Sequence, residues 1–512
     1  MFIKIAMLVV FFGTMIGIGL YCRKHSTDVN GFVLGGRSVG PWLTAFAYGT
    51  SYFSAVVFVG YAGQFGWKYG IAATWAGIGN AIIGSLLAWI ILGRRTRIMT
   101  QHLDSATMPQ FFSSRYNSQG LKLLSSAVIF IFLIPYTASL YNGLSRLFGM
   151  AFDIPYEACV IVMSILTAIY VIAGGYMATA INDFIQGIVM IVGIIAVIIA
   201  VLSTQGGLTA AMDSLSRISS GAEGIKQGAL TSFFGPDPIN LAGVVLLTSL
   251  GTWGLPQMVQ KFYAIKNEKA ITKGTIISTI FAFIVAGGCY FLGGFGRLFT
   301  PDTTADGAVI FDSIVPNMLK GLPDVLIGVV IVLVLSASMS TLSSLVLTSS
   351  STLTLDFIKE KIHRNMNEKR QVFVMRVLIV VFIVISSIIA IVQHQGSVSF
   401  IAQLMGVSWG ALAGAFLAPF LYGLYWKGVT KAAVWVNILF STVVMIANMV
   451  VRNVFPTILQ SPINSGAFCM LAGLVIVPVV SGFTKKPDEK MIEDVFSCYA
   501  QSVTVSVKEH MG

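Results

Sequence analysis

The sequence predicts an all-α polytopic membrane protein with about 13 transmembrane helices, on two observations. The first is composition: 56% of the residues are hydrophobic and only 10% are charged, against about 45–50% and about 25% in soluble domains. The second is a series of thirteen apolar stretches, each close to the roughly twenty residues that an α-helix needs to cross a bilayer. No connecting segment is long enough for a separate soluble domain.

The apolar stretches follow one another along almost the whole chain. The first begins near Lys4 and ends at Arg23 and Lys24. Because it has no convincing A-x-A cleavage site, we expect a retained helix and not a signal peptide. The stretches form a single transmembrane domain, 1–483, followed by a polar cytoplasmic tail, 484–512. The expected spans are residues 4–22, 42–66, 71–93, 120–148, 156–175, 183–203, 239–260, 274–298, 323–355, 372–393, 397–424, 429–451 and 463–483.

Basic residues are distributed unevenly between alternate loops. One set of loops carries clusters, such as those at 94–97 and 359–370, whereas the other set carries isolated residues such as Lys68 and Arg146. Loops rich in Lys and Arg stay on the cytoplasmic side. We therefore expect a multi-pass protein of the plasma (cell inner) membrane with its N-terminus outside and its C-terminus in the cytoplasm. The net charge of +11 then reflects topology in a lipid bilayer, and nucleic acid is not expected as a partner.

Cysteine and histidine positions argue against a metal centre or a catalytic centre. The five cysteines are odd in number and show no CxxC spacing, which disfavours a disulfide framework and a zinc site. All five histidines fall in loops, at span ends or in the tail. A membrane enzyme needs a cluster of His, Asp, Glu or Cys at one depth. We therefore expect neither an enzyme nor a bound cofactor.

Two short motifs interrupt apolar stretches: Gly-Thr-Ser-Tyr-Phe-Ser at 49–54 and Gly-Thr-Trp-Gly-Leu-Pro-Gln at 251–257. Non-helical backbone is tolerated in a bilayer only where protein or a polar cavity supplies hydrogen-bond partners. Corresponding breaks in two halves of a chain indicate the binding site of a secondary transporter; close helix packing by small residues is the alternative. The candidate substrate-binding residues are Gly49, Tyr52, Tyr136, Trp253, Gly254 and Gln257.

Acidic residues avoid the centres of the expected spans, and Asp183 is the nearest exception. Because Asn182 and Asp183 open an expected helix, we favour capping of free backbone N–H groups over ion binding for this carboxylate. A proton-coupled carrier generally needs a titratable group at membrane depth, and the sequence shows no clear one. Coupling to a cation held by neutral oxygens fits the sequence better.

The ninth expected span supplies such oxygens, with Ser and Thr recurring from 336 to 352. Most of these hydroxyls are expected to bond back to their own helix or to connect helices. Ser340 and Thr341 are the expected cation ligands, together with unwound carbonyls near Thr50 and Phe53. A hard cation prefers such oxygen ligands.

The sequence also contains Leu-Gly-Gly-Arg-Ser at 34–38, Gly-Gly-Tyr-Met at 174–177, Asn-Asp-Phe-Ile-Gln-Gly at 182–187, Gly-Leu-Pro-Gln at 254–257 and Met-Ser-Thr-Leu at 339–342. In combination these motifs resemble those of the sodium:solute symporter family, and the resemblance runs over residues 5 to 483, nearly the whole chain. It implies a five-plus-five inverted repeat with a leucine-transporter-like core, 42–203 and 239–424, and peripheral helices at 4–22, 429–451 and 463–483.

The resemblance implies a sodium-coupled secondary active symporter that imports a small organic solute by alternating access. Its expected partners are the sodium ion and that solute. A proton-coupled symporter or a passive channel of the same fold is the alternative. The family's sodium site falls on the backbone carbonyls of Thr50, Phe53 and Ala337 and the hydroxyls of Ser340 and Thr341.

The solute is less well defined by the resemblance. Proline carriers of the family have Ser-Asp-Met-Ser where this sequence reads Ser-Tyr-Phe-Ser at 51–54, and aromatic residues in place of Thr248 and Thr252. These departures argue against proline. Segments 182–187, 254–256 and 423–426 resemble the pantothenate branch, from which Trp253 and Gln257 depart. We expect a carboxylate-bearing solute, such as pantothenate, an amino acid or a monocarboxylate, because half-helix N-termini favour anionic groups.

Overall fold

Helices form almost all of the regular structure in the computed structural model, which describes residues 2–22, 28–51, 53–152, 154–221, 227–394 and 400–499. Within these ranges the only β-structure is two isolated bridges. The helices are α1 (Phe2–Cys22), α2 (Val29–Leu34), α3 (Pro41–Thr50), α4 (Ala62–Tyr69), α5 (Thr74–Gly79), α6 (Arg94–His102), α7 (Met108–Tyr116), α8 (Gln119–Phe152), α9 (Tyr156–Thr204), α10 (Leu208–Arg217), α11 (Pro238–Leu250), α12 (Pro256–Ala264), α13 (Glu268–Ala282), α14 (Gly288–Gly293), α15 (Ile314–Leu319), α16 (Asp324–Thr352), α17 (Lys359–Lys361), α18 (Glu368–His394), α19 (Phe400–Tyr425), α20 (Lys431–Val450), α21 (Pro462–Phe483) and α22 (Glu489–Ser497).

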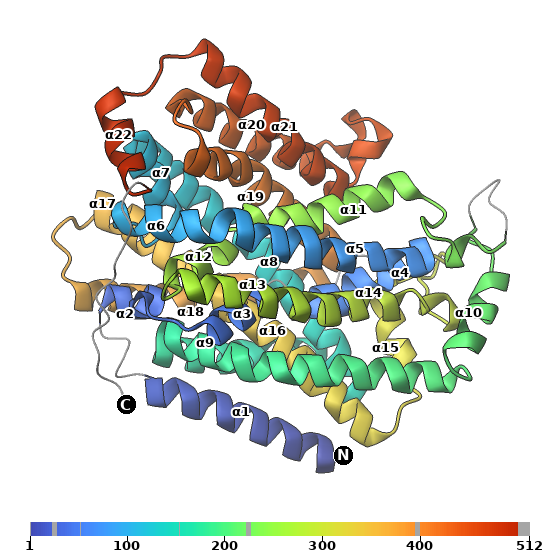
Figure 1. Ribbon diagram of the computed structural model, residues 1–512. Coiled ribbons are helices and arrows are strands. Elements are labelled where there is room, and N and C mark those ends of the chain that lie inside the picture. Colours follow the sequence, from blue (N-terminus) through green and yellow to red (C-terminus); the bar gives the residue numbers. More distant parts are fainter. Residues whose placement is uncertain are drawn as a thin grey trace.

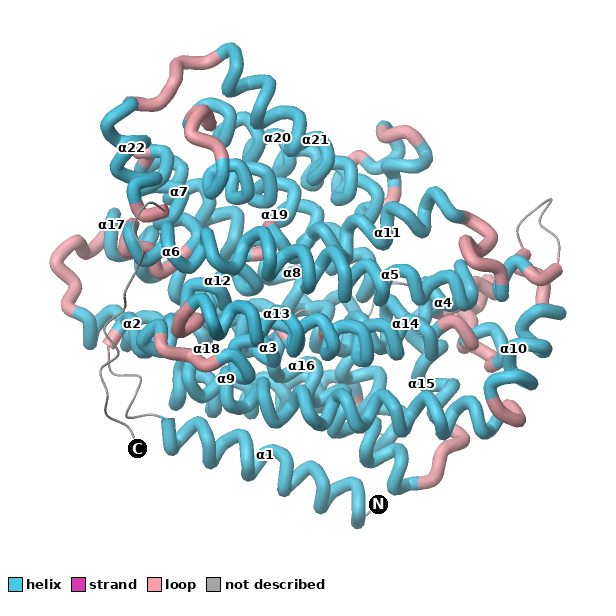
Figure 2. The backbone as a smooth tube through the Cα atoms, viewed as in Figure 1, coloured by secondary structure: helices cyan, strands magenta, loops and turns pink. Residues whose placement is uncertain are grey.

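Most long helices run side by side between two ends of the molecule (Figure 1). One end carries α6, α7, α17 and α22, and the other carries α10 and α15. We call them the α22 end and the α10 end. Most loops gather at these two ends (Figure 2), as expected when the backbone between them must satisfy its own hydrogen bonds in lipid.

Among the described residues, eleven helical segments are long and apolar enough to cross a membrane. This confirms the predicted fold class, but the predicted count of about 13 differs at two places. The predicted span 42–66 is broken after Thr50, and its second half joins the predicted span 71–93 in one apolar segment, Val56–His102. The predicted span 156–175 is represented by a shorter apolar helix, Tyr156–Ile169.

The two halves of α9 meet at Gly175, whose φ of 57° and ψ of −152° are not helical. A Cβ atom here would lie 2.8 Å from the Phe32 ring and 3.0 Å from the Phe32 carbonyl oxygen, so the turn requires glycine both for its positive φ and for the close approach of α2. The second half begins directly after the turn. The predicted loop at 176–182 is therefore wrong, because these residues are helical.

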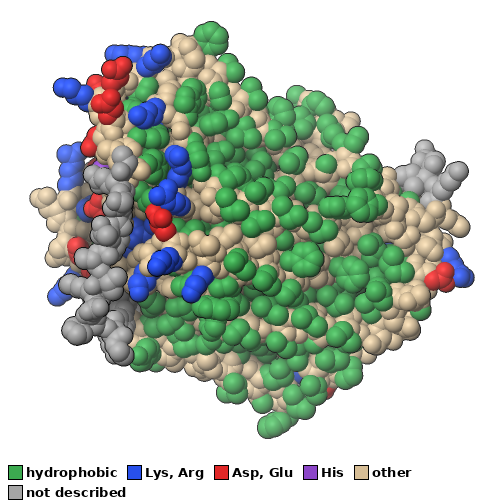
Figure 3. All heavy atoms as spheres, viewed as in Figure 1, with side chains coloured by type: hydrophobic (Ala, Val, Ile, Leu, Met, Phe, Trp, Pro, Cys, Tyr) green, Lys and Arg blue, Asp and Glu red, His purple; other side chains and the backbone are tan. Residues whose placement is uncertain are grey.

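Burial separates central from peripheral helices. In the most apolar 18-residue stretch of α19, 94% of the residues are buried inside the protein. The corresponding share is 22% in α1 and 39% in α20 and α21. Figure 3 shows apolar side chains across the middle of one face and most of that face's charged side chains at the α22 end. Such an apolar surface is unfavourable in water and fits a lipid environment.

Residues 484–499 of the predicted tail are folded back on the α22 end. The Arg115 guanidinium lies 5.0 Å from the centre of the Phe496 ring, and Arg95 lies 4.6 Å from the centre of the Tyr499 ring. The His102 ring nitrogen Nε2 is 3.0 Å from the Asp494 carbonyl oxygen. These cation–π contacts and the His102 contact hold α22 and Tyr499 against α6 and α7.

Candidate functional site

The first break lies between α3 and the helix that continues into α4. Helical hydrogen bonding stops at Thr50 and resumes at Ala55; Tyr52, a predicted substrate residue, lies outside the described residues. The new half-helix is capped by Ser54, whose Oγ accepts from the Val56 N–H at 3.2 Å. The Ala55 N–H donates to the Ser338 hydroxyl of α16 at 3.2 Å. The break therefore depends on α16 for part of its hydrogen bonding.

Two hydroxyls of α16 meet the carbonyls that the first break leaves free. Ser340 Oγ is 3.1 Å from the Thr50 carbonyl oxygen and 3.0 Å from that of Ala337. Thr341 Oγ1 lies 3.1 Å from the Thr50 oxygen, 3.3 Å from the Phe53 oxygen and 3.0 Å from the Ala337 oxygen. All five residues are fully buried. The structure thus brings together all five predicted sodium ligands, in a group of oxygens that we call the oxygen cluster.

The oxygen cluster has the composition of a site for a hard cation. Three carbonyls and two hydroxyls are neutral oxygen donors, and hard cations such as Ca²⁺ take oxygen ligands at about 2.3–2.6 Å. Oxygens that lie 3.0–3.3 Å apart can surround one small cation at that distance. No cluster of three His, Cys, Asp or Glu side chains suited to a transition metal occurs within the described ranges.

The second break lies between α11 and α12. A single 3₁₀ turn at Gly251–Trp253 leads through Gly254 and Leu255 to Pro256, the first residue of α12. The Trp253 indole N–H donates to the Ile83 carbonyl oxygen at 2.9 Å, and the Thr252 hydroxyl donates to the Gly84 carbonyl oxygen at 3.0 Å. The Trp253 indole N–H therefore helps to hold the second break in place.

Gln257 is the predicted residue with the most unusual environment. It is fully buried in the first turn of α12, and neither its amide oxygen nor its amide nitrogen has a hydrogen-bond partner within the part of the chain that the structure describes. A buried amide without partners is costly. Its position at a half-helix N-terminus suits a group that meets a polar ligand.

The two predicted glycines lie at close helix contacts. A Cβ atom on Gly49 would lie 2.4 Å from the Phe281 ring of α13, and one on Gly254 would lie 2.8 Å from the Leu417 backbone nitrogen of α19. Glycine at both positions is explained by packing alone. Neither contact argues for or against a ligand.

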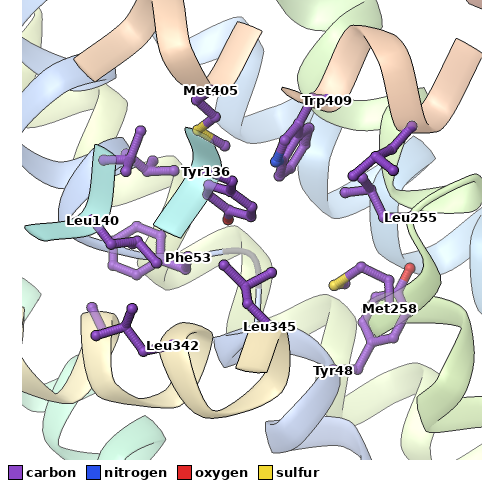
Figure 4. Packing of buried hydrophobic residues seen from close by; sticks show 14 of the residues in the cluster. Tyr48, Phe53, Tyr136, Leu140, Leu255, Met258, Leu342, Leu345, Met405 and Trp409 are labelled. Carbon is purple, nitrogen blue, oxygen red and sulfur yellow. The ribbon is translucent and has the colours of Figure 1, made fainter. Parts of the chain in front are cut away.

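Tyr136 of α8 faces a residue that the sequence analysis missed, Trp409 of α19. Their rings are nearly perpendicular, with centroids 6.0 Å apart. Figure 4 shows both side chains directed toward the same region as Met258 and Leu345. A single Trp inside a predicted span was the only sequence signal for Trp409.

A buried ion pair corrects two predictions. Asp183 lies inside the second half of α9, well past its start, so the predicted capping role is wrong. Its Oδ2 is 4.0 Å from Nζ of Lys261, and the two side chains are 0% and 3% exposed. Lys261 directly follows the predicted span 239–260, which predicts a residue of a basic loop, but it is a buried residue of α12. Two charged side chains are therefore buried within apolar segments that are long enough to cross a membrane, Gly174–Thr204 and Pro238–Ala264.

The α22 end is closed by contacts between segments that flank the two breaks. The Val39 N–H donates to the Ala264 carbonyl oxygen at 3.2 Å, and the Lys266 N–H donates to the Val39 carbonyl oxygen at 3.0 Å. Arg37 donates to the carbonyl oxygens of Ser105 at 2.8 Å and of Tyr263 at 3.3 Å. Burial lowers the pKa of this guanidinium, but arginine stays protonated in proteins.

The α10 end is open by comparison. It contains a cavity of about 900 Å³ bordered by α4, α11 and residues 402–403 of α19, with polar side chains such as Gln64, Asn240 and Gln403. Next to Gln260, toward the α22 end, the cavity bordered by Thr348 and Ser351 holds only about 10 Å³, which is about the least space that admits one water molecule. The cavity at the α10 end is therefore far larger than the one beside Gln260.

Comparison with known proteins identifies the family. The model of the sodium:solute symporter family matches residues 32–454, so the chain belongs to this family. It is a sodium-coupled solute symporter and not an enzyme. Among curated relatives, the sodium/proline symporter of Staphylococcus aureus, for instance from strains JH9 and COL, is 29% identical over 443 residues, covering 83% of this chain and 82% of the relative.

Solved structures confirm the leucine-transporter-like fold. A Na⁺-coupled sialic acid symporter in a substrate-bound outward-open state has a TM-score of 0.75 at 16% identity, covering 96% of this chain and 99% of that chain. Mhp1, a nucleobase-cation-symport-1 family transporter in a closed conformation, has a TM-score of 0.53 at 14% identity, covering 92% and 98%. At these identities the likeness concerns the fold alone.

The closure of the α22 end gives a testable prediction. Arg37→Ala should expose a cysteine introduced at Ser351, which is buried, because a charge-assisted hydrogen bond contributes about 1.5–3 kcal/mol, or about tenfold or more in an opening equilibrium. The measurement is the rate of thiol labelling in detergent on a background without native cysteines. Arg94→Ala, which removes an exposed pair with Glu268, is the control. Equal rates with and without Arg37 would show that the backbone bridge alone closes this end.

Proposed function

We propose that the protein imports a small carboxylate-bearing organic solute together with sodium by alternating access. The oxygen cluster carries the proposal for the ion. It lies between the first break and α16, so a bound cation connects two segments that must separate if the site is to open. Binding of sodium then favours one arrangement of these segments, which is how an ion is coupled to the transport of a second ligand.

Gln257 carries the proposal for the solute. Its unpartnered amide lies in the first turn of α12, where free backbone N–H groups and the helix dipole attract negative charge. Met258 follows Gln257 in α12, and its side chain is directed toward the same region as the rings of Tyr136 and Trp409, which offer aromatic surface there (Figure 4). The relationship to sodium/proline symporters supports a carboxylate, while the departures at 51–54 argue against proline itself. Pantothenate, another amino acid or a monocarboxylate fits these features.

The proposed transport unit is the transmembrane domain, 1–483, with its two repeats at 42–203 and 239–424. The contrast between the two ends of the molecule supports alternating access. The cavity at the α10 end has about 900 Å³, whereas the Arg37 contacts close the α22 end. The buried Asp183 and Lys261 pair keeps a proton-coupled cycle as the alternative. Replacing external sodium by potassium, at several proton gradients, separates this alternative from sodium coupling.

The sodium proposal predicts that Ser340→Ala and Thr341→Ala each raise the sodium concentration for half-maximal uptake by about tenfold or more. A lost polar contact in a desolvated site costs about 1–3 kcal/mol, and 1.4 kcal/mol is a tenfold change in affinity. Reciprocal coupling requires solute affinity at low sodium to fall as well. Sodium-dependent uptake and solute binding are the measurements.

Two buried serines of the same helix provide matched controls. Ser349→Ala and Ser350→Ala remove hydroxyls that are fully buried but take no part in the oxygen cluster, so sodium dependence should stay near the wild-type value. Thr341→Ser keeps a hydroxyl and should retain most sodium affinity. Wild-type sodium dependence in well-expressed Ser340→Ala and Thr341→Ala variants would remove the sodium assignment from these residues.

The solute proposal predicts that Gln257→Ala weakens solute binding by about tenfold, because a hydrogen bond to a charged carboxylate contributes about 1.5–3 kcal/mol. Trp253→Ala should also weaken it. Sodium affinity without solute should change little. The measurement is ligand-induced thermal stabilisation of the purified protein with amino acids, monocarboxylates, pantothenate and sugars, in sodium and in potassium.

Asn437→Ala is the control for loss of a buried amide, because Asn437 donates to the Gly414 and Ala415 carbonyl oxygens and is not one of the candidate solute residues. It should lower stability without changing solute affinity. Unchanged solute affinity in both Gln257→Ala and Trp253→Ala would place the solute elsewhere.

The proposed orientation places the α10 end outside and the α22 end in the cytoplasm of the cell that carries the protein in its plasma (inner) membrane. It is supported by the excess of basic residues in the loops at the α22 end. A cysteine replacing the exposed Asp213 of α10 should react with a membrane-impermeant thiol reagent in intact cells, and one replacing Lys485 should not. The reverse labelling pattern would invert the topology.

A further inference from the structure

The ion pair of Lys261 and Asp183 is an unusual feature of the bundle interior. Burying two charges costs several kcal/mol per ion, so such a pair often stabilises a protein less than two apolar side chains of the same size. The separation of 4.0 Å is long for an ion pair, and neither carboxylate oxygen of Asp183 accepts a hydrogen bond from any described residue. Stability alone is a weak reason for this pair.

The Lys261 ammonium is linked to the oxygen cluster through two hydroxyls. Its Nζ is 3.1 Å from Ser344 Oγ, which is itself 2.8 Å from Ser51 Oγ. Ser344 follows Thr341 by three residues, or about 4.5 Å along the axis of α16, and Ser51 follows Thr50. The ammonium thus lies about one helical turn from the oxygen cluster and joins the half-helix α12 to the first break.

The surroundings of the ammonium resemble a cation site. Asp183 Oδ2 and the hydroxyls of Ser344 and Ser51 are oxygen groups of the kind that hard cations prefer. The oxygen cluster itself consists of neutral groups, so Asp183 is the carboxylate that would compensate a cation near it. Lys261 already supplies a positive charge at this place.

We propose that Lys261 is a fixed internal cation, which neutralises Asp183 and thereby limits the protein to one coupling sodium ion per cycle. Removing the ammonium leaves a buried carboxylate beside two hydroxyls, and a second sodium ion takes its place. The inference deepens the proposed function, because it rests on a first sodium ion bound at the oxygen cluster.

The test is equilibrium binding of radioactive sodium to the purified full-length protein in detergent, without solute. Wild-type protein should bind one sodium ion with a Hill coefficient near one. Lys261→Met should bind two sodium ions, with a steeper sodium dependence and with the second ion lost again in the double variant Lys261→Met, Asp183→Asn. Lys261→Arg keeps the charge and should bind one ion. Lys266→Met, which removes an exposed lysine five residues further along, is the matched control.

A second variant keeps the proposal testable if Lys261→Met does not fold. Asp183→Asn leaves the ammonium uncompensated near the oxygen cluster, so Coulomb repulsion should lower affinity for the first sodium ion by about tenfold or more, and the double variant should restore it. One bound sodium ion in folded Lys261→Met, or wild-type affinity in Asp183→Asn, would overturn the proposal.

The two sodium hypotheses fail in different variants. If the oxygen cluster does not bind sodium, Ser340→Ala keeps wild-type sodium binding whatever stands at position 261. If only the internal cation is wrong, Ser340→Ala loses its sodium affinity while Lys261→Met binds one ion as the wild-type protein does. In the combined variant Ser340→Ala, Lys261→Met, the proposal requires the ion at Asp183 to remain.

Discussion

The carbonyl oxygens of Thr50 and Phe53 leave the helical ladder inside an apolar bundle, and the rest of the site depends on how they are satisfied. In lipid there is no water to bind such groups, so protein must supply their partners. The structure supplies Ser340 and Thr341 of α16, at 3.1–3.3 Å. One constraint thereby fixes the break, the placement of α16 beside it and the presence of oxygens that suit a cation.

The same constraint underlies the proposed control of the protein's shape by an ion. Hydroxyls that satisfy the break in the absence of an ion are also able to share a cation with the same carbonyls. In the proposed sodium-bound state, the ion replaces hydrogen bonds between the first break and α16 with shorter contacts to both. Through Lys261 and Ser344, α12 touches the same stretch of α16, which gives the proposed ion site a direct contact with the half-helix that follows the second break.

Periodicity and composition are sufficient for the parts of the fold that depend on local sequence. Apolar length predicts most of the spans, Gly-containing motifs predict the two breaks, and the Ser and Thr run predicts which helix faces the first break. The error at Asp183 has a local cause: one glycine, Gly175, makes a turn that sequence reasoning treats as a seven-residue loop. The shifted helix start made an interior carboxylate resemble a capping residue.

The other site features that the sequence does not predict depend on tertiary contacts. From sequence alone, a lysine near the end of a predicted span is interpreted as a loop residue, because the four methylene groups of Lys usually extend the charge outward to water. Here α12 is only a half-helix and Lys261 lies within it, so the side chain turns inward to Asp183, 78 residues earlier in the chain. Only the packing of α9 against α12 and α16 reveals that pairing. A costly charge pair beside a neutral oxygen cluster is better explained by the balance of charge during ion binding than by stability.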